Sequence, residues 1–145
     1  MLLRDERLIA LDCVIVSAKK AADVYEDAAG IAQDDATTEL FLRLSRRRDE
    51  MAASLEEPIR ALGGLPSDPD VESETVGQVW RHLKAALSTD EREQLIAEAA
   101  SLEDGLTSCI DGALAAELPE EIRALLEQYR KEVAMDRGRL GAPGG

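Results

Sequence analysis

Apolar side chains recur every three or four residues along the first half of the chain, a spacing that predicts two amphipathic helices. The first helix is expected over residues 4–29, with Gly30 as its stop. Its inward stripe consists of Leu8, Leu11, Ile15, Ala18, Ala22, Tyr25 and Ala29. The second helix is expected to be capped by Asp34 or Asp35 and to end at Gly63 and the glycine after it. Its inward positions are expected to be Leu40, Leu44, Arg47, Met51, Leu55 and Leu62.

The end of the second helix and the segment after it carry the breaks in this pattern. Pro58 lies inside the helix, where a proline removes a backbone hydrogen bond, so we expect a kink or an early stop there. The connection over residues 63–88 is long enough to run the length of a bundle. Within it, Thr75 and Gln78 have capping-box spacing ahead of an apolar face that contains Trp80. This pattern predicts a short extra helix docked on the bundle.

Two more helices are predicted in the second half. The third is expected to begin at Ser88, which has capping-box spacing with Glu91. It carries two adjoining stripes, one of Leu95, Ala99, Leu102, Leu106 and Ala113, the other of Ile96, Ala100, Glu103, Thr107, Ile110 and Leu114. The fourth helix is expected to begin at Pro119 and to stop near Gly138. Its inward positions are Ile122, Leu125, Tyr129, Glu132, Val133 and Asp136.

The predicted fold class is all-α, an antiparallel four-helix bundle. Short links make the two helices of each pair antiparallel, and one long crossover between the second and third helices is the ferritin-like variant of this bundle. With 145 residues there is room for one domain, which we assign to residues 1–140. The remaining residues, 141–145, have the sequence Gly-Ala-Pro-Gly-Gly and are predicted to form a flexible tail.

The net charge of the chain and the length of its apolar runs indicate which classes of partner to exclude. The formal net charge is −13, which argues against a nucleic-acid partner because neutralising phosphates requires a basic face. The Arg46-Arg47-Arg48 triplet is a local exception and could dock an acidic partner or an anion. The most apolar early run, residues 8–16, is interrupted by Asp12 and is too short to span a membrane. We therefore expect neither a nucleic-acid nor a membrane partner.

The cysteines and the first residues bear on localisation. The chain starts with acids among its apolar residues, unlike the basic and then apolar stretch of a secretory signal. Cys13 and Cys109 fall on helical patterns without the spacing of a metal site. We expect them to be reduced, buried thiols in a cytoplasmic protein, with a disulfide between them as the alternative.

Five short motifs occur in a specific order: Tyr25-Glu26-Asp27-Ala28-Ala29, Leu62-Gly63-Gly64, Trp80 with Leu83-Lys84-Ala85-Ala86-Leu87, Leu102-Glu103-Asp104, and Leu118-Pro119-Glu120-Glu121-Ile122-Arg123. In their order and spacing the chain resembles a bacterial ferritin-like family of unknown function, over nearly its whole length. The resemblance implies a bundle built around a di-iron centre. Such a centre uses one Glu from each of two helices and a Glu-x-x-His from each of the other two.

The ligand set implied by this resemblance is incomplete. The single histidine, His82, follows Val79 by three residues, so the sequence contains no Glu-x-x-His, and we expect His82 to be a surface residue. Compared with the family pattern, Ala22 and Arg47 occupy the glutamate positions of the first two helices, and Met135 occupies the histidine position of the fourth. The acids that remain as candidate metal ligands are Glu50, Glu103 and Glu132.

Those acids also suggest a different arrangement. Glu103 and Glu132 fall in otherwise apolar stripes, where an isolated carboxylate would cost several kcal/mol or take up a proton. A guanidinium can hold carboxylates bidentately, so we predict that Arg47 replaces the metal charge in an interior ion-pair network with these two acids. Glu50 would be a further member. In the alternative, Arg47 points into solvent with the two neighbouring arginines and Glu132 pairs locally.

Two functions follow from these alternatives, and neither assigns a catalytic residue. In the first, the chain is a ferritin-like module that has lost di-iron chemistry, binds no cofactor, is not an enzyme, and acts in structure or interaction, for example as a homo-oligomer. In the second, Glu50, Glu103 and Glu132 bind iron or manganese in an atypical carboxylate site with redox or storage activity. A carrier of a small ligand between the helices is a third alternative.

Overall fold

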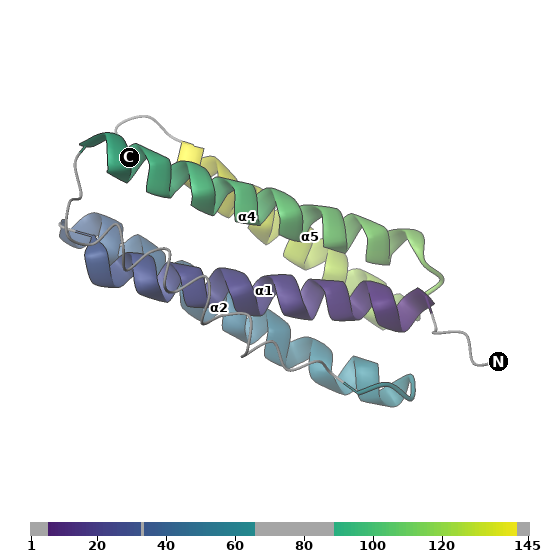
Figure 1. The fold of residues 1–145 in the computed structure, drawn as a ribbon. Coiled ribbons are helices and arrows are strands. Elements are labelled where there is room, and N and C mark those ends of the chain that lie inside the picture. The colour runs from purple at the N-terminus through teal and green to yellow at the C-terminus, as the bar shows by residue number, and fades with distance from the viewer. Residues whose placement is uncertain (1–5, 33, 66–88, 142–145) are drawn as a thin grey trace.

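Four long helices make up the part of the chain that the computed structural model describes, residues 6–32, 34–65 and 89–141 (Figure 1). They are α1 (Glu6–Ile31), α2 (Asp35–Ala61), α4 (Thr89–Ala115) and α5 (Glu120–Gly141). No strand occurs in these ranges, which confirms the all-α prediction. The predicted helix around Trp80, and with it His82 and Ser88, falls outside the described residues.

The four helices pack as two antiparallel hairpins. Figure 1 shows that α1 and α2 run in opposite directions, as do α4 and α5, and that α2 ends at the opposite end of the bundle from the start of α4. The helix α1 packs against both α2 and α4, α5 packs against α4, and α2 and α5 meet only lightly. This arrangement confirms the predicted bundle. No helix in the described ranges has a stretch long and apolar enough to cross a membrane.

The ends of α2 are fixed by the residues that the sequence indicated. Asp34 is the N-cap, and its side chain accepts a hydrogen bond from the Thr37 amide at 2.9 Å. At the other end, the Gly64 amide donates to the Ile59 carbonyl and the Gly63 amide donates to the Arg60 carbonyl, both at 2.9 Å. This pair of bonds is a Schellman motif, and it places Gly63 at a φ of +90°, a conformation that glycine adopts without steric cost.

Two helices extend further than the sequence predicted, and α2 does not stop at its proline. The helix α2 continues past Pro58 to Ala61, so the early stop expected at the proline does not occur. The helix α1 runs through Gly30 to Ile31, and α5 runs through Gly138 to Gly141. In α5, Leu140 is only 4% exposed and packs in the core. Burial of such an apolar side chain offsets the modest helix propensity of a nearby glycine.

The core consists of two clusters of buried apolar side chains, and each cluster draws on all four helices. The first cluster includes Leu11, Ile15, Met51, Leu55, Leu106, Ile110, Leu126 and Val133. The second includes Val24, Tyr25, Phe41, Leu44, Ala99 and Leu140. In the second cluster the rings of Tyr25 and Phe41 stack with their centroids 5.9 Å apart. The inward stripe predicted for the first helix is confirmed, since six of its members are buried: Leu11, Ile15, Ala18, Ala22, Tyr25 and Ala29.

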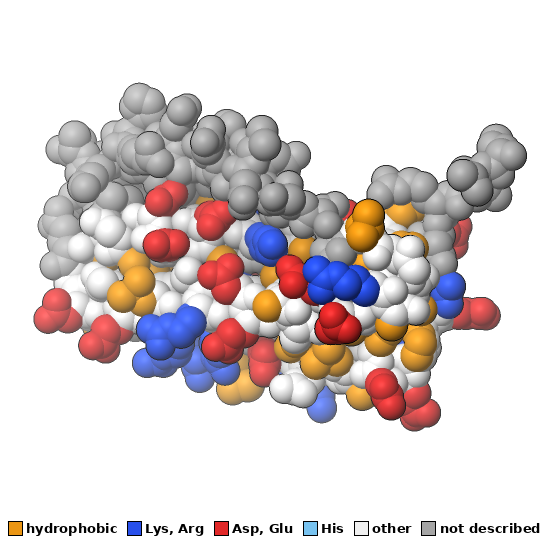
Figure 2. All heavy atoms as spheres, turned by 90° about the horizontal axis from the view of Figure 1, so that it is seen from below, with side chains coloured by type: hydrophobic (Ala, Val, Ile, Leu, Met, Phe, Trp, Pro, Cys, Tyr) orange, Lys and Arg blue, Asp and Glu red, His pale blue; other side chains and the backbone are white. Residues whose placement is uncertain are grey.

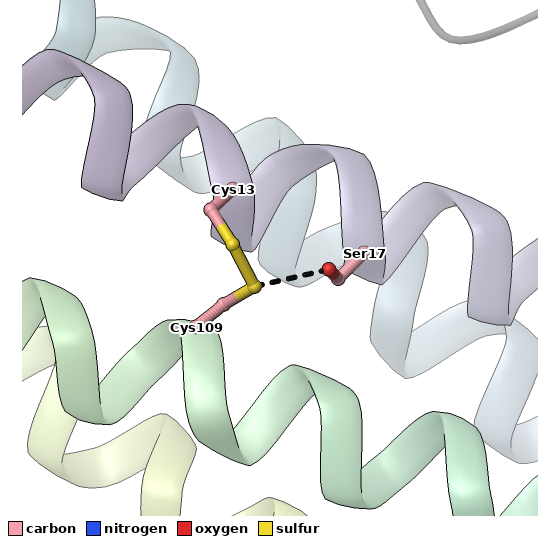
Figure 3. The surroundings of a disulfide bond; sticks show 3 residues. All are labelled: Cys13, Ser17 and Cys109. Atoms are coloured by element: carbon pink, nitrogen blue, oxygen red, sulfur yellow. Dashed lines mark hydrogen bonds between the residues drawn. A yellow bond between two sulfur atoms is a disulfide. The ribbon is translucent and has the colours of Figure 1, made fainter.

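A disulfide joins Cys13 of α1 to Cys109 of α4 (Figure 3). The expectation of reduced, buried thiols is therefore wrong, and the alternative is what the structure shows. Cys13 is exposed and Cys109 is half-buried, because both lie at the outer edge of the contact between their helices. Their Cα atoms are 5.6 Å apart, within the usual range for a disulfide. The cytoplasmic localisation that accompanied the expectation of thiols stays a prediction.

Candidate functional site

A charged layer separates the two core clusters. It consists of Arg48 from α2, Glu103 from α4 and Asp136 from α5, and none of the three side chains is exposed to solvent. Along α2, Arg48 lies between Leu44 of the second cluster and Met51 of the first. The layer therefore crosses the middle of an otherwise apolar interior.

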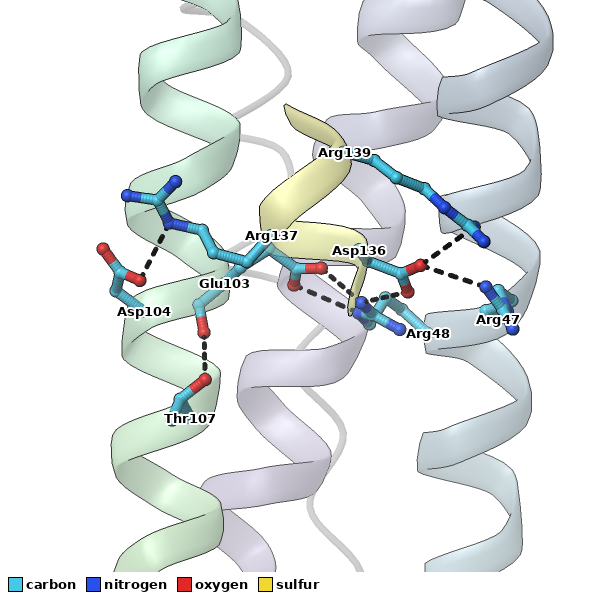
Figure 4. Close-up of polar contacts among 8 residues, drawn as sticks. All are labelled: Arg47, Arg48, Glu103, Asp104, Thr107, Asp136, Arg137 and Arg139. Carbon is cyan, nitrogen blue, oxygen red and sulfur yellow. Dashed lines mark hydrogen bonds and ion pairs between the residues drawn. The ribbon is translucent and has the colours of Figure 1, made fainter. Parts of the chain in front are cut away.

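The Arg48 guanidinium lies between the two carboxylates of the layer (Figure 4). Its Nε donates to Glu103 Oε2 at 3.1 Å, and its Nη2 donates to Glu103 Oε1 as well. The same Nη2 donates to Asp136 Oδ2 at 2.8 Å. Arg48 thus holds one carboxylate bidentately and a second one with a single bond, which is the geometry of a strong charge-assisted pair.

Two further arginines reach the layer from its edge. Arg47 Nη1 lies 3.0 Å from Asp136 Oδ1, and Arg139 Nη1 lies 3.4 Å from the same oxygen. The Arg47 side chain is 36% exposed, so it remains partly hydrated. The charges of the two buried carboxylates are therefore balanced by a buried guanidinium and by cations at the edge, without an isolated buried charge.

Burial and charge act together on the acid–base properties of the layer. Burial lowers the pKa of Arg48, but its hydrogen bonds and ion pairs with Glu103 and Asp136 outweigh that effect and raise the pKa overall. The guanidinium therefore stays protonated. Burial raises the pKa of Glu103, and the bonds from Arg48 offset part of this rise.

Tyr25 of α1 is a buried residue that interacts electrostatically with all three members of the layer. Burial raises the pKa of its hydroxyl far above the ordinary value, and the negative charge of Glu103 adds to the rise. Among the described residues, Tyr25 Oη and Arg48 Nη1 are buried donors that have no hydrogen-bond partner. The tyrosine is thus held neutral beside the ion pairs.

The structure contains an interior ion-pair network, but not the one predicted from the sequence: its central residue is Arg48 and not Arg47, and its second acid is Asp136 and not Glu132. The inward face of α2 carries Phe41, Leu44, Arg48, Met51, Leu55 and Ile59. The stripe predicted from the sequence shares Leu44, Met51 and Leu55 with this face but is rotated by one residue at the arginine. Arg47 does take part, through Asp136 at the edge. The basic triplet is thus divided among three environments, since Arg46 is exposed, Arg47 is half-buried and Arg48 is buried.

The acids named as candidate ligands lie in different places. Glu103 is in the charged layer, whereas Glu50 is exposed. Glu132 is half-buried and accepts a hydrogen bond from Gln128 at 3.3 Å, away from the layer. Within the described ranges, no group of three His, Cys, Asp or Glu side chains is close enough to hold a metal ion. Metal binding by Glu50, Glu103 and Glu132 stays a prediction.

Asp136, like Arg48, is a member of the layer that was not predicted to belong to a site. Its position on the predicted inward stripe of the fourth helix was a usable signal, because it follows Tyr129 and Val133 by whole helical turns. A charged residue in such a stripe indicates an interior partner.

Comparison with known proteins places the chain in a family. A family model described as Domain of unknown function (DUF2383) matches residues 8–116. The chain belongs to this family. No curated protein and no solved structure matches it. The DUF2383 match includes Arg48 and Glu103 but ends before α5, so Asp136 completes the charged layer from outside the matched residues.

The face of the molecule seen in Figure 2 carries charges of both signs. On the face seen in Figure 2, to which α2 contributes, acidic side chains alternate with a few groups of basic ones. Exposed pairs such as Arg130 with Asp111, at 2.6 Å, join α5 to α4 across this kind of solvated surface. Pairs of this type contribute little to stability, so the interior layer is the distinctive polar feature of the described structure.

Proposed function

We propose that the chain is a ferritin-like structural or interaction module in which an arginine-centred ion-pair network takes the place of a di-iron centre. The observation that carries this proposal is the position of Arg48, whose guanidinium lies between buried carboxylates from two other helices. Two inward carboxylates from different helices are also what a metal centre in a helical bundle requires.

Electrostatics supports the absence of a metal. A divalent cation that approached Glu103 and Asp136 would have to displace Arg48, whose bonds to both acids hold it in place. If the guanidinium stayed, a positive ion would be brought next to a buried positive charge. Either event is unfavourable in a site from which water is excluded.

A role in positioning the helices follows from the same contacts. The helices α2 and α5 meet only lightly, yet Arg48 and Arg47 of α2 both bind Asp136 of α5. Arg48 also binds Glu103 of α4. Buried polar networks of this kind favour one helix register over its alternatives, because any other register leaves a charge unpaired. A module with a fixed register presents a constant outer surface to a partner or to a second copy of the chain.

The test is the metal content of the purified protein. The chain is expressed in medium supplemented with iron and manganese, and bound metal per chain is measured for the unmodified protein and for Glu103→Gln. We expect less than a tenth of an equivalent in both. Stoichiometric metal in the unmodified protein that disappears in Glu103→Gln would overturn the proposal and favour the alternative, an iron or manganese protein with redox or storage activity.

Self-association is measured separately by light scattering over a range of protein concentrations. A discrete dimer or higher oligomer would support the interaction role. A monomer at all concentrations would limit the proposal to a structural module that acts with a different protein.

A further inference from the structure

The disulfide has an asymmetric environment. Cys13 is exposed and Cys109 is half-buried. The Ser17 hydroxyl, one turn after Cys13 on α1, lies 3.2 Å from Cys109 Sγ (Figure 3). Because a disulfide sulfur carries no proton, the hydroxyl is the donor in this contact. Cys13 is thus the more exposed residue of the pair, and Cys109 Sγ already faces a hydrogen-bond donor.

An open hollow of about 360 Å³ adjoins the two cysteines. Both cysteines line it, together with Ile9 and Ala10 from α1 and Gly112 from α4. Its volume falls at the lower end of the range for small-molecule sites. A reagent of modest size can therefore rest against an apolar wall while it contacts the disulfide.

We propose that the Cys13–Cys109 disulfide is a site of thiol–disulfide exchange with small thiols that carry no charged group besides the reacting thiolate. In the first step, the thiolate of the external thiol attacks Cys13 Sγ and forms a mixed disulfide. The bond between Cys13 and Cys109 breaks, and its electron pair leaves with Cys109 as a thiolate. In the second step, another external thiolate attacks the sulfur of the bound thiol, which releases Cys13 as a thiolate. Water protonates both cysteines, so two thiols are oxidised to one disulfide as the protein disulfide is reduced.

The direction of attack follows from the environment of each sulfur. Exchange requires access to the attacked sulfur, and Cys13 is the exposed one. The departing thiol leaves faster when its thiolate is stabilised, and the Ser17 hydroxyl is placed to stabilise that of Cys109. Access and leaving-group stabilisation thus favour the same direction.

The choice of thiol follows from the lining. Ile9 is 44% exposed in the wall of the hollow, so an apolar chain on the thiol can cover it. Glu6 also lines the hollow, and the whole chain has a formal net charge of −13. Like charges disfavour the approach of an anionic thiol. The site therefore prefers an uncharged thiol with an apolar group over an anionic one.

The first experiment locates the attacked sulfur. Folded, oxidised protein is incubated briefly with 2-mercaptoethanol or benzyl mercaptan, quenched with acid, and alkylated at its free thiols. Peptide mass spectrometry should find the mixed disulfide on Cys13 and the alkyl group on Cys109. Adducts found mainly on Cys109 would overturn the proposed direction, and protein that exchanges only after unfolding in denaturant would overturn the site itself.

The second experiment tests Ser17 and the lining. Ser17→Ala should slow exchange by about threefold to tenfold, the value of one hydrogen bond, and Ser17→Thr should restore the rate because it keeps the hydroxyl. Ser108→Ala, a change in the α4 wall of the same hollow, is the matched control and should leave the rate unchanged. At equal thiolate concentration, benzyl mercaptan should react faster than 2-mercaptoethanol, and 2-mercaptoethanesulfonate more slowly. Equal rates for Ser17→Ala and the unmodified protein, or for all three thiols, would contradict the mechanism. Circular dichroism on each variant verifies that the helices are intact.

Discussion

Arg48 of α2 and Asp136 of α5 are 88 positions apart in the sequence, and Arg48 Nη2 lies 2.8 Å from Asp136 Oδ2. Both side chains are fully buried. The backbones of their two helices come close only lightly, and this ion pair joins them together with the Arg47–Asp136 pair and the Ser54–Tyr129 hydrogen bond.

Replacing Arg48 should strongly destabilise the fold. In Arg48→Met the apolar stem is roughly preserved, but Glu103 and Asp136 lose their buried partner. Breaking a buried pair from one side costs about 3–5 kcal/mol, because it leaves an uncompensated charge. Urea unfolding followed by circular dichroism measures the loss.

Arg47→Met is the matched control for that variant. Arg47 is the neighbouring arginine, binds the same Asp136, and has a side chain that is 36% exposed. Its ion pair is partly hydrated, so we expect a loss of only about 1 kcal/mol or less. Equal losses for the two variants would contradict the assignment of Arg48 as the central residue.

Replacing the whole charged layer with apolar residues should restore the stability. The variant combines Arg48→Met with Glu103→Leu and Asp136→Leu, so no charge of the layer remains. Exchanging a complete buried network for apolar side chains of similar volume is often neutral or stabilising, by about 1–4 kcal/mol. Urea unfolding should thus rank the triple variant well above Arg48→Met. A triple variant as unstable as Arg48→Met would show that the layer contributes more than its charge balance.

Local sequence signals were sufficient for the two ends of α2. Asp34 caps α2 because its carboxylate can reach the first free amides, and Gly63 ends the helix because it tolerates a positive φ. Both properties belong to single residues and their near neighbours. They do not depend on what packs against the helix, so the sequence alone predicts them.

The central arginine could not be assigned in the same way. A stripe through Leu44, Arg47 and Met51 and a stripe through Leu44, Arg48 and Met51 both alternate spacings of three and four. Neighbouring residues on a helix differ by about 100° in direction, so only the packing of the other helices decides between them. The disulfide could not be predicted from local sequence for the same reason. Cys13 and Cys109 are 96 positions apart, and their pairing depends on the contact between α1 and α4.

Gly63→Ala should destabilise the end of α2. The residue has a φ of +90°, where an alanine Cβ is strained whatever the space around it. The expected loss is about 1 kcal/mol. Gly30→Ala is the control: Gly30 lies within α1, and apart from the adjoining backbone of that helix no atom of the described residues lies within 4 Å of the position its Cβ would occupy, so this change should be neutral or stabilising. Thermal unfolding of both variants provides the comparison. An unfolding temperature of Gly63→Ala equal to that of the unmodified protein would contradict the role of Gly63 in ending α2.

Reducing the disulfide should lower the free energy of unfolding, but the bundle should remain folded. The bond closes a loop between positions 96 residues apart, and loops of this size restrict the unfolded chain strongly. The expected loss on reduction is about 2–5 kcal/mol. Urea unfolding with and without a phosphine reductant measures it. The double variant Cys13→Ala with Cys109→Ala is the control, and it should show the lower stability in both conditions.

Tyr25 should make the protein sensitive to alkaline pH. Burial raises the pKa of its hydroxyl above the ordinary value of 10.0, so above that pH the unfolded chain releases a proton that the folded chain retains. The stability from Tyr25 is therefore present below pH 10.0 and falls as the pH rises further, by up to about 1.4 kcal/mol per pH unit. Tyr25→Phe removes this dependence of stability on pH.

Because Tyr25 Oη has no hydrogen-bond partner among the described residues, the substitution should change stability little at neutral pH. Urea unfolding from about pH 8 to about pH 11 should show two curves that agree at first and separate above pH 10.0, with the variant the more stable. Curves that stay parallel over the whole range would mean that Tyr25 ionises without unfolding.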